Sequence, residues 1–345
     1  MIRTKTTLVI GAGASCELQM PGSADVLARV VQGYDFSRLG TPQQSRESGI
    51  LVRYLMKHAE QVGREHRDMV NASQVLRNAA RVGKSIDTII DQYDHDPMVV
   101  AAGKIAIAFL MGQAETRANL KEAPRNPGEL PLLGKPEETW LYWLGQIFTS
   151  GLPRSKLERA FSDLTIVCFN YDRAIEHYLP HALVMAYGMD LKEAQSLVAE
   201  RLVIYHPYGA VGRLPWQRGQ EAQAEWAGSE QPWNIHAIAG QIRTHSERMA
   251  DRDWLHRLRL SVAEAKRLVF LGFGFAPQNM ELLFDRSLSH SPEVVATVHG
   301  LPEGTRRLVA RLLKRHCGLE SDDLLVLDPA RAFEVVRDYS LLLES

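Results

Sequence analysis

The segment Leu8-Val9-Ile10-Gly11-Ala12-Gly13-Ala14-Ser15 joins a short apolar run to a glycine-rich turn. The three apolar residues predict a buried strand of the kind that occupies the centre of a parallel sheet. Gly11 and Gly13 let the backbone turn sharply, and a helix is predicted to begin near Ser15. Because the first N–H groups of a helix are unpaired, this arrangement predicts an anion site, for which a pyrophosphate is the usual occupant.

The turn matches the dinucleotide-binding fingerprint only in part. That fingerprint, GxGxxG, places a third glycine where this chain has Cys16. The pattern is therefore not that of a typical dehydrogenase. A tight turn between a strand and a helix explains Gly-Ala-Gly equally well, so the assignment of a nucleotide depends on later segments.

Composition limits the classes of protein that fit. The chain has 345 residues, a formal net charge of −1 and 45% hydrophobic residues, which is typical of a globular protein. Without a basic excess, direct nucleic-acid binding is not expected. We find no signal peptide and no apolar run that approaches the length of a membrane span, so a cytoplasmic protein without membrane contact is expected. Three separate cysteines (Cys16, Cys168 and Cys317) predict neither a zinc site nor disulfides.

The order of the segments predicts an α/β fold with a Rossmann-like, mostly parallel sheet and helices on both faces. Further apolar runs predict strands at 164–169, 202–205, 267–271, 294–298 and 324–327. Residues 45–150 are predominantly helical in pattern and predict a helical insertion within a single domain, 1–345. The segment Arg213–Trp233 reads as a long loop, which predicts a lid, a binding segment or disorder.

Polar or glycine residues follow four of the predicted strands. They are Gly11 and Gly13, Asn170 and Asp172, His206, and Gly272 and Gly274. Ligands of an open parallel sheet bind at the carboxyl ends of its strands, which share one edge. We therefore expect these residues to converge although they lie far apart in the sequence.

The ordered set of motifs resembles the sirtuin-like family, which binds NAD on a Rossmann-type sheet. The motifs are GAGAS at 11–15, FNYD at 169–172, YHPYG at 205–209 and LGFGF at 271–275, and Asp87 resembles an acidic position of the bacterial defence branch. The paired cysteines of protein-deacylating sirtuins are missing. The chain is more similar to antiphage effectors that hydrolyse NAD to ADP-ribose and nicotinamide. This resemblance implies a homo-oligomer and a separate partner, such as a ring-forming DNA-translocating ATPase or an Argonaute.

Side-chain chemistry gives each candidate residue a role in that reaction. Asn170 has a donor and an acceptor to orient water or ribose, and His206 titrates near neutrality and suits a general base. Asp172 would bind the carboxamide of nicotinamide or stabilise the positive charge that develops on the ribose. The predicted pyrophosphate ligands are Gly11, Ala12, Gly13 and Ser15, with Asp87 also at the site. Gly272, Gly274 and Phe275 would line the adenosine side.

Each assignment has a simpler alternative. Asn170 and Asp172 are residue types that cap helices, His206 precedes a proline as turn residues do, and Asp87 suits the first turn of a helix. For the whole protein, the alternatives are a module that binds NAD or ADP-ribose without cleaving it and an NAD-dependent protein deacylase.

Overall fold

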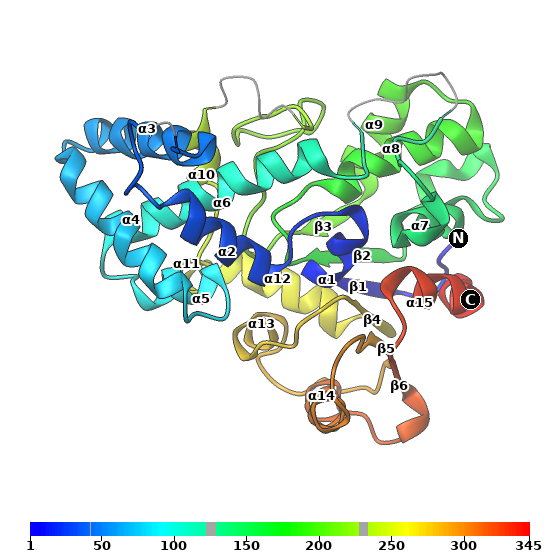
Figure 1. Cartoon of the computed structure of the whole chain (residues 1–345). Helices are drawn as coiled ribbons and strands as arrows, with labels where there is room; N and C mark the ends of the chain where they lie inside the picture. Colours follow the sequence, from blue (N-terminus) through cyan, green and yellow to red (C-terminus); the bar gives the residue numbers. More distant parts are fainter. Residues whose placement is uncertain (42, 122–128, 228–233) are drawn as a thin grey trace.

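The computed structural model describes the chain except residues 42, 122–128 and 228–233. Its centre is a six-stranded sheet in the order β3-β2-β1-β4-β5-β6, with every pair of neighbours parallel (Figure 1). The strands are β1 (Thr6–Ile10), β2 (Leu164–Cys168), β3 (Val203–Tyr205), β4 (Arg267–Leu271), β5 (Glu293–Thr297) and β6 (Leu325–Asp328). The predicted Rossmann-like α/β fold is confirmed, and all six predicted strands are present within two residues.

Side chains alternate between two cores on either side of the sheet, as the pleat requires. Leu8 and Ile10 of β1 point into one core, and Val9 points into the other. The first core is covered by helices α7 (Trp140–Thr149), α8 (Ala174–Tyr187) and α15 (Ala332–Asp338). The second is covered by α12 (Arg252–Ala263), α13 (Pro277–Leu283) and α14 (Glu303–Cys317). Helices therefore bury both faces of the sheet.

A group of helices follows β1 and lies beyond one end of the strands (Figure 1). It comprises α2 (Ser23–Gly33), α3 (Arg46–Gln61), α4 (His66–Ala80), α5 (Ile86–Gln92) and α6 (Pro97–Arg117), joined later in the chain by α10 (Ile235–Ala239) and α11 (His245–Ala250). The predicted insertion at 45–150 thus contains α3 to α7. Of these, α7 packs against α8 and α15 rather than within the group.

Helix α6 corrects one expectation. It is long and apolar enough, by length and composition, to cross a membrane, whereas no such run was expected. Yet 72% of its apolar window is buried inside the fold. Neighbouring helices surround α6, so all of its sides can be apolar, as is typical of a core helix.

Helices α9 (Leu191–Arg201), α15 and α16 (Ser340–Glu344) were among the elements that were not predicted. The first helix was also placed wrongly. Helix α1 (Ala12–Ser15) begins directly after Gly11, which is extended, and a 3₁₀ turn, Cys16–Leu18, follows it. It is a single turn that ends where a helix was expected to begin, and Ser15 is buried there with its hydroxyl bonded to Asp172 in the turn after β2.

Candidate functional site

The glycine turn after β1 packs directly on the turn after β4. The Gly11 amide donates to the Leu271 carbonyl at 2.9 Å, and the Gly13 amide donates to the Gly272 carbonyl at 3.0 Å. A Cβ atom on Gly11 would lie 2.5 Å from the Gly272 oxygen, and Gly272 has a φ of +58°. Close backbone packing therefore already explains these glycines. The contact lies between β1 and β4, where the strand order reverses and where ligands of such sheets bind.

Gly274 is different, because a Cβ atom there would meet nothing within 4 Å. It lines a cavity of about 520 Å³ together with Gly13, Gly272 and Thr297. The Thr297 hydroxyl, at the end of β5, accepts a hydrogen bond from the Gly272 amide at 2.7 Å. Packing within the protein therefore does not explain why this position is glycine. Because Gly274 lies on the wall of a cavity at the switch point, its lack of a side chain would let a ligand approach the backbone closely.

The residues of this cavity that were missed by the sequence analysis include Glu17 and Arg331. The Glu17 carboxylate accepts hydrogen bonds from the amides of Trp140 (3.0 Å) and Phe333 (3.1 Å). Burial raises the pKa of Glu17 to about 7 against the effect of these bonds. Phe275, by contrast, is not among the lining residues: its φ is +53°, and its ring packs with Phe270 and Phe273 in the core.

On the other side of the glycine turn, three buried polar side chains form a chain of hydrogen bonds. The Asn170 amide donates to the Gly11 carbonyl at 3.0 Å and to the Ser15 hydroxyl at 2.6 Å. The Ser15 hydroxyl donates to Asp172 at 2.7 Å, and the other Asp172 oxygen accepts from the Ala174 amide at 3.1 Å. Burial raises the pKa of Asp172, while Ser15 opposes that shift. Asp172 thus both supports the start of α8 and belongs to the cluster.

This cluster lines a second, smaller cavity of about 70 Å³, together with Ala12 and Asp87. Asp87 reaches the cavity from α5, where Ser85 caps the helix by accepting from the Thr88 amide at 3.2 Å. The Tyr171 hydroxyl donates to the Asp87 carboxylate. Burial raises the pKa of Asp87 to about 7. The structure therefore brings Ala12, Ser15, Asp87, Asn170 and Asp172 together.

His206 lies next to this cluster and contacts the backbone of Asn170 rather than its side chain. Its Nδ1 is 3.1 Å from the Asn170 carbonyl oxygen, and its Nε2 is 3.0 Å from Glu176 Oε1. A carbonyl only accepts, so Nδ1 carries a proton, and one further proton is shared between Nε2 and Glu176. Burial lowers the pKa of His206, but the Glu176 carboxylate and the Cys168 sulfur together outweigh burial and raise it well above its ordinary value. Both ring nitrogens are thus engaged, and the ring lines a third cavity at the edge of the sheet.

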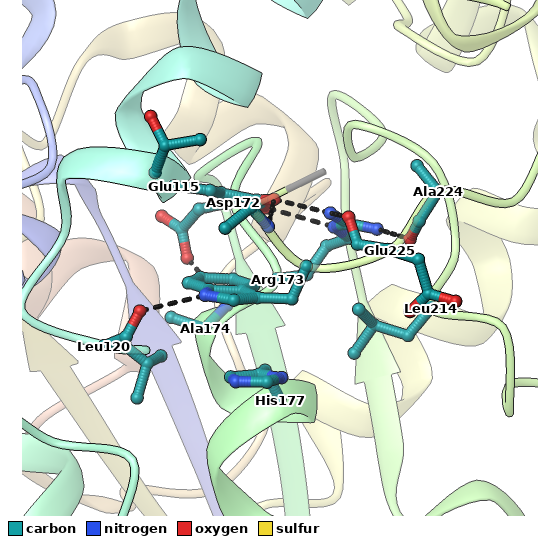
Figure 2. A network of polar contacts seen from close by, with 12 residues as sticks. Glu115, Leu120, Asp172, Arg173, Ala174, His177, Leu214, Ala224 and Glu225 are labelled. Carbon is teal, nitrogen blue, oxygen red and sulfur yellow. Dashed lines mark hydrogen bonds and ion pairs between the residues drawn. The ribbon is translucent and has the colours of Figure 1, made fainter. Parts of the chain in front are cut away.

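A buried ion pair holds the turn that carries Asp172 (Figure 2). Arg173 donates to both carboxylate oxygens of Glu115 on α6, at 3.0 and 2.5 Å, and to the carbonyls of Ala224 and Glu225. The two charged side chains are 1% and 0% exposed. The turn after β2 is thereby joined to the helical group and to the long loop.

The described part of the long loop, residues 213–227, is accordingly anchored. Trp226 is 2% exposed, donates to the Leu120 carbonyl at 2.9 Å and stacks on His177 with ring centroids 4.6 Å apart. This part of the loop is held by buried contacts and is therefore ordered; whether it serves as a lid or a binding segment stays a prediction. Residues 228–233 of the prediction lie outside the described residues.

Comparison with models of known protein families finds no match for this chain, and no curated protein matches it either.

Proposed function

We propose that the chain hydrolyses NAD to ADP-ribose and nicotinamide as a cytoplasmic effector of bacterial antiphage defence. The observation that carries this proposal is the meeting of the glycine turn, Asn170, Asp172 and Gly274 at the switch point of the sheet. Ligands with a pyrophosphate bind at this position in open α/β sheets. The reaction itself, NAD hydrolysis, is inferred from the resemblance of the ordered motifs to sirtuin-like effectors.

Two cavities border the glycine turn and suit the two halves of a dinucleotide. The adenosine half would occupy the larger one beside Gly274, and the pyrophosphate would lie along Gly13. Nicotinamide would enter the smaller one beside Asn170 and Asp172. That cavity is small, so the proposal requires Met111 and Tyr171, which line it, to move when the ring enters.

For this reaction the protein mainly has to bind NAD and position the attacking water. Water attacks the anomeric carbon and loses one proton to solvent, the bond to nicotinamide breaks, and nicotinamide leaves with the bonding electron pair. Asn170 would orient the ribose or the water, and a carboxylate at Asp172 or Asp87 would stabilise the developing positive charge. His206 would act as a base only after giving up its contact with Glu176 or with the Asn170 carbonyl, so in the state described it positions Asn170.

A second candidate function follows from the same geometry. Because both nitrogens of His206 are engaged within the described part of the chain, the residue predicted to be the base is not free, which favours a module that binds NAD or ADP-ribose without cleaving it. In either case homo-oligomerisation and a separate defence partner, an ATPase or an Argonaute, are part of the proposal.

The deciding experiment is incubation of the purified protein with NAD, alone and with candidate partners, followed by measurement of released nicotinamide. Hydrolysis predicts turnover that Asn170→Ala abolishes. Saturable NAD binding without nicotinamide release under any activating condition would favour the sensor. If the protein showed no NAD binding and no turnover, both functions would be excluded.

A further inference from the structure

The third cavity, which we call the β3-edge pocket, lies beside the edge strand of the sheet, away from the switch point. It has a volume of about 490 Å³, within the usual range for small-molecule sites. Glu176 of α8, His206, Arg243, and Trp254 of α12 are among its lining residues. Neither cavity at the glycine turn includes any of these side chains.

The charges of the β3-edge pocket leave a positive surplus. Four arginines and three carboxylates line it: Arg213, Arg218, Arg243, Arg248, Glu176, Glu221 and Asp251. Arg213 pairs with Glu221 at 2.8 Å, Arg248 with Asp251 at 3.4 Å, and Arg218 with Glu200, which lies outside the lining, at 2.5 Å. Arg243 donates only to a backbone carbonyl, at 2.8 Å, among the contacts of the described residues. An anionic group in the pocket would therefore meet a guanidinium with no carboxylate partner.

Glu176 provides an unpaired hydrogen-bond acceptor, whereas Arg243 provides an unpaired donor. Its side chain is 5% exposed, and Oε1 contacts His206. Within the described part of the chain, Oε2 is buried and has no hydrogen-bond partner. A buried carboxylate oxygen without a hydrogen bond lowers the stability of the fold. A donor such as a ligand hydroxyl would therefore stabilise this atom.

Aromatic rings complete the lining. Trp216 and Trp254 both border the pocket, and the Arg248 guanidinium lies 3.8 Å from the centre of the Trp254 ring. Indole rings offer stacking surface to a planar ligand. From the unpaired guanidinium, the unpaired carboxylate oxygen and these rings, we propose that the β3-edge pocket binds a nucleoside phosphate. Its phosphate would contact Arg243 and its base would lie against the tryptophans. A ribose hydroxyl would donate to Glu176 Oε2, which requires the pocket wall to move because that oxygen is buried in the state described.

The test must separate this pocket from the cleft at the switch point, which also suits a nucleotide. Gly274→Leu does so, since its side chain would enter the larger cavity without meeting protein atoms at Cβ. In this background we would titrate AMP by calorimetry, and compare Arg243→Ala and Glu176→Gln with Arg252→Ala. Arg252 is an exposed arginine of α12 that does not line the pocket, and serves as the matched control.

We expect AMP to bind the Gly274→Leu protein at one site. Arg243→Ala and Glu176→Gln should each weaken that binding roughly tenfold or more, because each removes a charged contact. Arg252→Ala should leave it unchanged, and adenosine or inorganic phosphate alone should bind more weakly than AMP. No binding at millimolar AMP, or binding that neither pocket variant alters, would overturn the proposal and indicate that water satisfies Glu176. Because nicotinamide release is not measured, this outcome is independent of NAD hydrolysis.

Discussion

The buried ion pair between Glu115 and Arg173 allows a quantitative test of how the site is held. Glu115→Ala removes both carboxylate acceptors of a guanidinium that is 1% exposed, and it removes the acceptor of the Ala227 amide, 3.3 Å away. The two carbonyls of the long loop cannot neutralise the charge that is left. Breaking a buried pair in this way costs about 3–5 kcal/mol.

That loss is a large part of the 5–15 kcal/mol by which proteins are typically stable. For a chain of this size we expect the thermal unfolding midpoint to fall by about 5 °C or more. Scanning calorimetry measures it, and loss of near-ultraviolet dichroism from the buried Trp226 reports on the network itself. Glu303→Ala is the matched control, because its ion pair with Arg307 is solvent-exposed and should contribute little.

A double-mutant cycle tests the reasoning further. Arg173→Met alone should also destabilise the fold, because it leaves the buried Glu115 carboxylate unpaired. The double variant Glu115→Leu with Arg173→Met should be less destabilised than the sum of the single variants, since no unpaired buried charge remains. A Glu115→Ala midpoint equal to that of the surface control, or strictly additive effects in the cycle, would refute the account.

Three further predictions concern the cleft. Asn170→Ala should abolish nicotinamide release while keeping a cooperative unfolding transition, measured by product chromatography and dichroism; full turnover would remove Asn170 from the mechanism. Gly272→Ala should yield little folded protein, whereas Gly274→Ala should fold normally, because only the first Cβ overlaps protein backbone; equal yields of soluble, folded protein would contradict the observed packing. The pKa of Asp87 is raised to about 7, so affinity for the cationic nicotinamide ring should increase as pH rises through 7, and Asp87→Asn should flatten that dependence in binding titrations.

The strands could be predicted because each is an apolar run bounded by turn residues, and such runs are a local property. The same holds for the positions of Asn170, Asp172 and Gly274, which directly follow strands. Given a parallel sheet, strand ends share an edge, so their convergence follows from the chain alone. Helix α9 was missed because its sequence is weakly apolar, and the two C-terminal helices were missed because they are short.

Interactions between distant segments could not be predicted in this way. The pairing of Glu115 with Arg173, the contacts of Glu17 and the role of Thr297 each join residues more than 20 positions apart. The direction in which a side chain points is also a tertiary property. His206 follows its strand as expected, yet its ring faces Glu176, and Phe275 turns into the core.

The sequence by itself determined the parallel sheet, its two faces and the residues at the strand ends, because hydrophobic periodicity and glycine turns act within a few residues. Only the tertiary structure decided which of those residues share a cavity and which are held by buried partners. The physical reason is that burial, charge pairing and the orientation of side chains arise from packing between elements, which no local pattern encodes.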